Sequence, residues 1–330
     1  MSQASRPYVR LNLPGQHPGE SSALGLAKSA LANGWLALWE ALDSALASRR
    51  WDVMGTIDAS DRHGVTALHL AANAGRESTV RALIARGASV DPCTVAVEDG
   101  DDDEEEDEFA GDWQTHYGGW TPLLLACREE HHECVSVLVA AGASVHASVD
   151  VSSSGDCVES TLTLSAGTGS LRSLQMVLDA GASVHVPANS WSPLHAAIWG
   201  RGEARYECVA ALLRAGADAN ALDHVGRSVL ELAVQPRRAG TPRLISTLLR
   251  KGARPLAADS AVLSYYDIKV YNPQIITYFD AIRRAGGYAR YEAMRRAPFV
   301  AALTRCGGFP LPSEMISIVV AFWVQHALEY

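Results

Sequence analysis

The sequence predicts an all-α solenoid built from helix-turn-helix repeats that are joined by hairpin or turn connections. A pattern made of a Thr or Ser cap, an apolar helix start and a closing Gly-Ala pair returns five times between residues 61 and 256. The clearest copies also place apolar residues at positions i, i+3 and i+4 of a second helix, as an amphipathic helix requires. Because no single copy can bury such a stripe alone, the copies are expected to stack.

The two clearest copies share one spacing. The first reads DRHGVTALHLAA from Asp61, and the second reads GWTPLLLA from Gly119. In both, 21 residues separate the Thr from a closing glycine, Gly87 or Gly142. Thr or Ser, with Pro where present, favours a helix start. The closing glycine is expected to end the second helix in a left-handed conformation.

Three further copies follow with weaker consensus. The third runs from Ser160 to Gly181 with the same spacing of 21 residues. The fourth begins at Ser192 and the fifth at Ser228, and both are three residues longer. The simplest explanation is a longer loop between their two helices.

This pattern resembles the ankyrin consensus, in which D-x-x-G-x-T-P-L-H-x-A-A is followed by V-x-x-L-L and a closing G-A. The resemblance covers residues 61–256. It implies that His69 and His195 bond neighbouring hairpins. It also implies that partner proteins meet the hairpin tips and the concave face of the first helices, so the expected function is protein–protein interaction without a cofactor.

Composition and charge exclude several other classes of protein. Of the 37 acidic residues, ten lie between Glu98 and Glu108, and the remaining 27 balance the 28 lysines and arginines. A near-neutral body lacks the basic face that nucleic acids require. The longest apolar run, 316–324, is far shorter than the roughly 18 residues of a membrane span. Six cysteines without a CxxC pair predict reduced thiols and a cytoplasmic protein, with the nucleus as the alternative.

Catalytic and metal-binding interpretations find little support in the sequence. The pair His131-His132 has no third ligand placed by sequence, so we expect a surface pair and no metal site. Cys134 and Cys208 share a position just before a core Val, where a small buried thiol fits. No G-x-S-x-G, P-loop or dinucleotide fingerprint stands in a convincing context. We therefore expect no enzyme.

The repeat register indicates which residues would contact a partner. Positions directly before the Thr slot, positions near the turn glycine and the ends of the first helices are the expected contact sites. Three tryptophans in such positions favour an interface, although local packing of Trp120 and Trp191 on their own hairpins or on the long insertion is the alternative. The predicted contact residues are Arg62, His63, Val65, Tyr117, Trp120, Arg128, Glu129, Glu159, Asn189, Trp191, Trp199, His224 and Arg227.

Segments outside the repeats have their own expected roles. Residues 1–33 are expected to be a flexible leader and residues 34–60 a helical cap. An insertion at about 92–115 is expected to be a disordered acidic loop, with contact to a basic partner as the alternative. Residues 257–287 resemble a degenerate sixth repeat, and residues 288–330 are expected to form a helical end.

The C-terminal segment suggests a second function. Its sequence LPSEMISIVVAFW, residues 311–323, resembles the opening helix of an F-box, although too few residues follow for a complete one. The resemblance implies docking on a cullin-type ubiquitin ligase adaptor, with the repeats selecting the substrate. A SOCS box fits worse, because the L-x-x-x-C spacing before Cys306 is absent, and an amphipathic capping helix is the other explanation. The predicted docking residues are Leu311, Pro312, Glu314, Met315, Val319 and Phe322.

Overall fold

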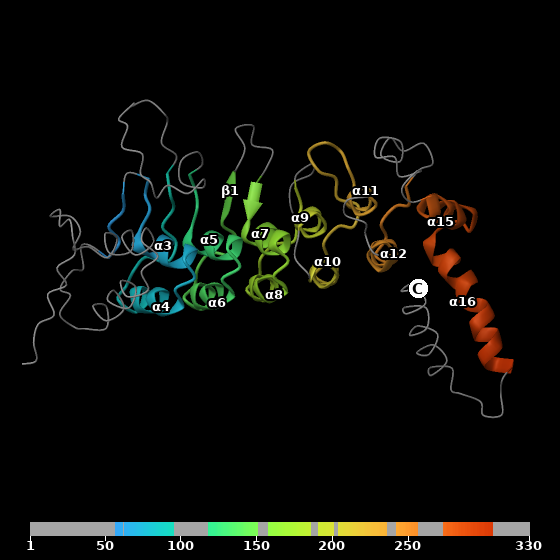
Figure 1. Cartoon of the computed structure of the whole chain (residues 1–330), viewed down its shortest axis with the longest axis horizontal. Helices are drawn as coiled ribbons and strands as arrows, with labels where there is room; N and C mark the ends of the chain where they lie inside the picture. The colour runs from blue at the N-terminus through green and yellow to red at the C-terminus, as the bar shows by residue number, and fades with distance from the viewer. Residues whose placement is uncertain are drawn as a thin grey trace, which may run out of the picture. The chain divides into compact units, whose positions relative to one another are not determined.

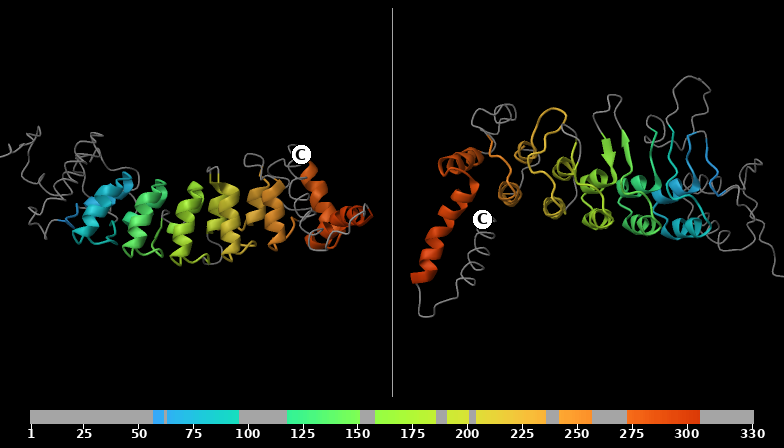
Figure 2. Two further views of the ribbon diagram at one scale, coloured as in Figure 1. Left: turned by 90° about the horizontal axis from the view of Figure 1, so that it is seen from below. Right: turned by 180° about the vertical axis from the view of Figure 1, so that it is seen from behind.

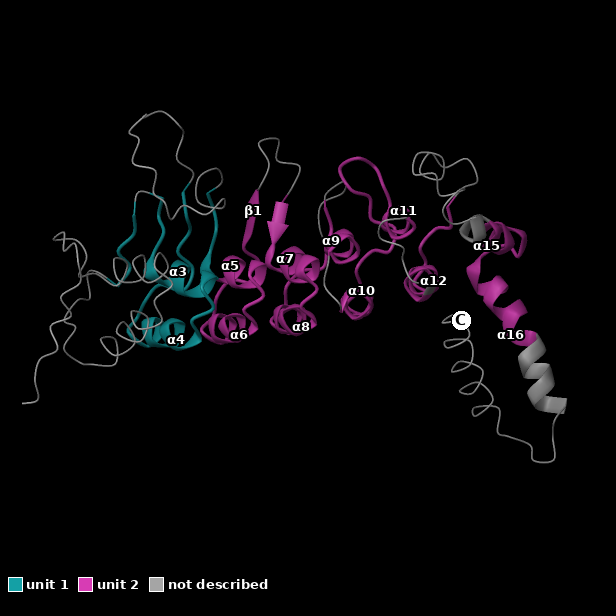
Figure 3. Ribbon diagram, viewed as in Figure 1, with its two compact units in different colours: residues 1–122 teal, residues 123–330 magenta. Residues whose placement is uncertain are grey.

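A computed structural model gives the arrangement of the chain (Figure 1). It describes residues 57–61, 63–95, 118–150, 158–185, 191–200, 204–235, 242–256 and 273–305. The chain divides into two compact units, residues 1–122 and 123–330, which Figure 3 distinguishes. The predicted leader and most of the predicted N-terminal cap lie outside the described residues, as does the segment after residue 305.

Five helix pairs follow the five copies of the sequence pattern. Each first helix begins directly after a Thr or Ser, and each second helix precedes a Gly-Ala pair. The pairs are α3 (Ala67–Asn73) with α4 (Glu77–Ala85), α5 (Pro122–Arg128) with α6 (His132–Ala140), α7 (Thr161–Thr168) with α8 (Leu171–Asp179), α9 (Pro193–Trp199) with α10 (Arg205–Arg214), and α11 (Val229–Ala233) with α12 (Pro242–Arg250).

The predicted caps and glycines are confirmed by the backbone. Thr66, Ser160, Ser192 and Ser228 each form a reciprocal capping box with the third residue of the following helix. The five closing glycines all have φ between 86° and 93°, a left-handed conformation that other residues adopt only at a cost. These glycines are Gly87, Gly142, Gly181, Gly216 and Gly252.

The longer fourth and fifth copies also have the expected cause. Their helices are joined by residues 200–204 and 234–241, whereas residues 169–170 suffice in the third copy. Between the second and third copies, β1 (Ser148–Asp150) pairs antiparallel with β2 (Val158–Ser160) as a hairpin. Single bridges replace this ladder at Ser60–Thr66 and Leu222–Ser228.

In the second unit the helices form two layers with the hairpins projecting on one side (Figure 1). Helices α7, α9 and α11 lie side by side in one layer, and α6, α8, α10 and α12 lie in the other (Figure 2). The apolar stripes of both layers meet in the core, where Leu138, Leu174, Leu212 and Leu248 are fully buried. Stacking therefore buries surface that no single pair covers.

Two helices follow the fifth pair. α15 (Pro273–Arg284) ends before Gly286 and Gly287, both with positive φ, and α16 (Tyr288–Arg305) packs on α15 and α12. Glu292 of α16 pairs with Arg250 of α12 at 2.8 Å and with Arg296 at 2.8 Å. Phe279 and Ile282 of α15 are buried, so α15 contributes apolar side chains to the core at this end of the unit.

Candidate binding surface

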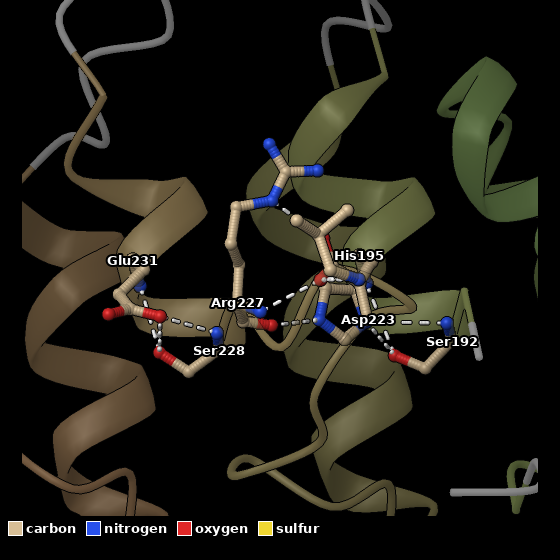
Figure 4. Close-up of polar contacts among 7 residues, drawn as sticks. Ser192, His195, Asp223, Arg227, Ser228 and Glu231 are labelled. Atoms are coloured by element: carbon tan, nitrogen blue, oxygen red, sulfur yellow. Dashed lines mark hydrogen bonds and ion pairs between the residues drawn. The ribbon is translucent and has the colours of Figure 1, made fainter. Parts of the chain in front are cut away.

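Two histidines connect successive hairpins as the sequence predicts. His195 Nε2 lies 3.3 Å from the carbonyl oxygen of Arg227, and its Nδ1 lies 2.6 Å from Ser192 Oγ (Figure 4). His69 Nε2 lies 3.1 Å from the carbonyl oxygen of Trp120, and its Nδ1 accepts the amide of Thr66. Because a carbonyl only accepts, Nε2 carries the proton and both rings are neutral. Burial accordingly lowers the pKa of His69 to about 4, and it also lowers the pKa of His195.

The hairpin before α11 is fixed by a buried carboxylate. Asp223 accepts hydrogen bonds from the amides of Val225 and Arg227 and from Arg227 Nε, at 3.0, 2.8 and 2.8 Å (Figure 4). Burial by itself would raise the pKa of Asp223, but these hydrogen bonds and the charge of Arg227 outweigh burial and lower it. Asp61 accepts from the amides of His63 and Val65 in the same way.

Three of the predicted contact residues are not at the surface. Val65 is fully buried, Trp120 is only 2% exposed, and His63 is also buried. The expectation that these hairpin positions are exposed is therefore wrong. For Trp120 the burial agrees with the alternative of local packing.

The start of the insertion explains this burial. The amide of Val95 donates to the carbonyl of His63 at 2.8 Å, and the amide of Thr94 donates to the carbonyl of Trp120 at 3.0 Å. Thr94 Oγ1 accepts the amide of Trp120 in return, at 3.0 Å. Residues 92–95, the first residues of the expected disordered loop, are thus described and bonded to both hairpins. This segment bonds both hairpins and leaves their side chains little access to water.

Seven predicted contact residues remain at least partly exposed in the second unit. Glu129, Trp199 and His224 are exposed, and the others are half-buried; the half-buried ones are Arg128, Glu159, Trp191 and Arg227. The remaining predicted contact residues, Arg62, Tyr117 and Asn189, lie outside the described part of the chain.

The two tryptophans of the fourth repeat form one aromatic surface. His195 and Trp199 lie four residues apart on α9, so they share one of its faces, and Trp191 directly precedes the cap of the same helix. The Trp191 ring lies 5.5 Å from the His195 ring and 6.0 Å from the Trp199 ring, which it meets edge to face at 84°. Such T-shaped pairs are favourable for aromatic rings. Trp199 keeps 42% of its surface exposed at the end of the helix.

Glu159 holds the corresponding hairpin position of the third repeat. It occupies the position before Ser160 that Trp191 occupies before Ser192. Burial raises the pKa of Glu159, and the nearby guanidinium of Arg128 opposes this effect. Arg128 Nε also lies 3.6 Å from Glu129 Oε1, so one cation is shared by two carboxylates.

The sequence did not predict the exposure of three apolar residues on the hairpins of the second unit, nor one unusual backbone position. Val158 and Leu222 are exposed on the hairpins, and Val225 is 64% exposed at a hairpin turn. An apolar residue inside the turn sequence Asp-His-Val-Gly is the signal that could have revealed Val225. Glu130 has φ of 62°, in the slot that Gly75 and Gly169 occupy in the neighbouring repeats.

The candidates for other chemistry have structural explanations. His132 Nε2 pairs with Glu133 at 2.8 Å, and the part of the chain that the structure describes contains no group of side chains arranged to hold a metal ion. Cys127, Cys134 and Cys208 are buried, and burial raises the pKa of Cys127 to about 12 and that of Cys208 to about 11. A thiol with so high a pKa is a poor nucleophile. Among the described helices, none is long and apolar enough to cross a membrane.

Comparison with known proteins agrees with this architecture. A family model of three ankyrin repeats matches residues 30–149, and a single ankyrin repeat model matches residues 189–224. The ankyrin repeat domain of human ASB11 is similar with a TM-score of 0.52 and 21% identity, over 77% of this chain and 96% of that one. A search of curated proteins finds no match. The chain therefore carries ankyrin repeats and folds as an ankyrin-repeat solenoid.

Proposed function

We propose that the chain binds a partner protein through the hairpin side of its third to fifth repeats, named here the repeat 3–5 surface. One observation carries the proposal. Most of the large apolar side chains that are exposed in the described residues lie on the hairpins and first helices of these three repeats. They are Val158, Trp199, Leu222 and Val225.

Exposed apolar residues gathered on successive repeats favour a protein interface. A contact that covers them removes apolar surface from water, at about 25 cal/mol per Å². Arg128, Glu129, Glu159, His224 and Arg227 supply polar groups around them, as the rim of an interface does. Ankyrin repeats in general mediate protein–protein interaction and are typically not enzymes, which supports the same conclusion for this chain.

A capture experiment with matched variants tests the proposal. The full chain and the double variant Trp199→Ala/Val225→Asp would each be immobilised, and captured proteins would be quantified by mass spectrometry. Partners that bind the repeat 3–5 surface should be lost at least tenfold with the double variant. Met294→Asp is the control, because Met294 is equally exposed but lies on α16. Partners retained by the double variant and lost by the control would refute the proposed location.

Docking on a ubiquitin ligase is a second proposal, based on the sequence of residues 311–323 alone. Leu311, Pro312, Glu314, Met315, Val319 and Phe322 would form the docking helix. The full chain should then capture cullin components that a chain ending at Arg305, which retains α16 whole, does not. Absence of these components from both samples would contradict the idea.

The acidic insertion and the compartment also remain proposals. We propose that residues 98–108 strengthen association with a basic partner, so their deletion should reduce the dependence of binding on salt. An unchanged salt response in the deletion variant would count against that role. The buried thiols fit the reducing interior of a cell, and localisation of a tagged full chain by microscopy tests that placement.

A further inference from the structure

We infer that Trp191, Trp199 and Glu159 form a binding site for one lysine or arginine side chain of the partner protein. This inference rests on the proposed function, because it specifies the chemistry of the partner at the repeat 3–5 surface. It predicts that the partner presents its cation on a segment lying across α7 and α9.

The two indoles provide surfaces that attract a cation. A cation within about 6 Å of an indole centroid is stabilised by the ring quadrupole, and tryptophan is the best of the aromatic residues for this contact. Trp191 and Trp199 stand nearly perpendicular to one another, with ring centroids 6.0 Å apart. A side chain in the angle between two nearly perpendicular rings can contact the face of each ring, where the quadrupole is negative. Trp199 is open enough for such contact, at 42% exposure.

The neighbouring helix leaves the indole of Trp199 accessible. The position of α7 that is equivalent to Trp199 is Gly167, seven residues after the cap in both repeats. Gly167 has no side chain to cover the indole from that side. α7 also approaches the end of α9 closely, since a Cβ on Gly200 would come within 2.9 Å of the carbonyl carbon of Gly167. The aromatic surface therefore continues directly onto the third repeat.

Glu159 supplies the negative charge. Glu159 and Trp191 each precede the cap of adjacent packed helices, so their backbones are about one interhelical distance apart, roughly 8–10 Å. In the inferred site the ammonium or guanidinium group lies between the carboxylate and the indole. Asp150 is also exposed, on the hairpin that carries Glu159. Arg128 shares its charge between Glu129 and Glu159, which leaves this side of the site negative.

Two basic side chains near Trp191, those of His195 and Arg227, do not repel a lysine or arginine bound at this site. The ring of His195 stacks on Trp191 but is neutral, because its Nδ1 accepts and its Nε2 donates within the fold. Arg227 on the next hairpin is paired with the buried carboxylate of Asp223 at 2.8 Å. Charge complementarity therefore favours a basic side chain over an acidic one. The flanking Val158, Leu222 and Val225 would contact apolar residues beside the cation.

Defined peptide pools test this inference with the full chain. Four pools of fluorescent nine-residue peptides would be random except for a fixed central Arg, Lys, Gln or norleucine, and binding would be measured by fluorescence polarisation. We expect the Arg and Lys pools to bind at least fivefold more tightly than the Gln and norleucine pools. The preference should weaken as salt is added, because part of it is electrostatic.

Variants of Trp199 and Glu159 assign the preference to this site. Trp199→Ala should abolish the preference for Arg and Lys, Trp199→Phe should retain part of it, and Glu159→Gln should reduce both the preference and its salt dependence. Met294→Ala is the control and should bind all pools as the wild type does. Circular dichroism melting would show that each variant is folded.

Each other outcome overturns the inference without deciding the proposed function. Equal binding of the norleucine and Lys pools would mean that the site recognises apolar side chains, and partner binding would still use the same surface. Failure of every pool to bind, or a Lys preference that survives Trp199→Ala, would also overturn the cation site. In each of these three cases the capture experiment with Trp199→Ala/Val225→Asp still decides the proposed function independently.

Discussion

The close contact between α7 and the end of α9 predicts that a side chain at Gly200 destabilises the fold. A Cβ added to Gly200 would overlap the carbonyl oxygen of Gly167 and come within 2.9 Å of its carbonyl carbon, both rigid backbone atoms. Overpacking of this kind costs about 1–3 kcal/mol. Replacing a glycine also reduces the entropy of the unfolded chain, which returns about 0.4–1 kcal/mol. Gly200→Ala should therefore lower the free energy of unfolding by about 1–2 kcal/mol.

Gly167→Ala is the matched control, because the same substitution is made on the other side of the contact. Its Cβ would meet only Ala196, at ordinary van der Waals distance, and Gly167 lies inside α7. Helix propensity then favours alanine by up to about 1 kcal/mol. Urea denaturation followed by circular dichroism measures both variants. A Gly200→Ala protein as stable as the wild type would refute the reasoning, as would a destabilised Gly167→Ala.

Three further predictions concern single side chains. Glu130→Gly should stabilise the fold by about 1 kcal/mol in urea denaturation, because its φ of 62° suits glycine, whereas Gly169→Ala at φ 77° should destabilise it by a similar amount. Acidification from pH 6.5 to 4 should lower the free energy of unfolding by about 3 kcal/mol, because His69 binds a proton near pH 6.5 in the unfolded chain but only near pH 4 in the folded one. In His69→Gln the urea midpoint should change less with pH over this range. Iodoacetamide should label exposed Cys93 in the native protein but buried Cys127 only in urea, as peptide mass spectrometry would show. Equal labelling of the two thiols in the native protein, or a pH dependence unchanged by His69→Gln, would contradict these expectations.

The repeat pattern predicted the fold because each consensus position has a local physical cause. A capping serine or threonine satisfies amides of the first turn, and a glycine at positive φ ends a helix, whatever the rest of the chain does. The extra residues of the fourth and fifth copies likewise had to form a longer loop. These features depend on a few neighbouring residues, which the sequence displays directly.

Exposure could not be predicted in the same way. Trp120 and Trp191 occupy the same position before a cap, yet Trp120 is buried and Trp191 is only half-buried. The difference for Trp120 comes from Thr94, a residue 26 positions earlier that bonds its backbone. An acidic run gave no reason to expect its first residues to pair with two hairpins. Burial at hairpin positions therefore depends on contacts that the repeat register does not contain.

The hairpin before α11 shows why rigidity supports a binding role. Its backbone is held from within by Asp223 and from the preceding repeat by His195, so the turn has little freedom to change. Val225 extends from this fixed turn into water, although most residue types could adopt the same backbone conformation there. An exposed apolar side chain does not stabilise the folded chain. When it stands on a rigid turn, however, little entropy is lost as a partner binds, because the side chain is already positioned for the contact. The same reasoning applies to Trp199, which the packed α9 holds beside Trp191, and it is the reason to place the partner across these two repeats.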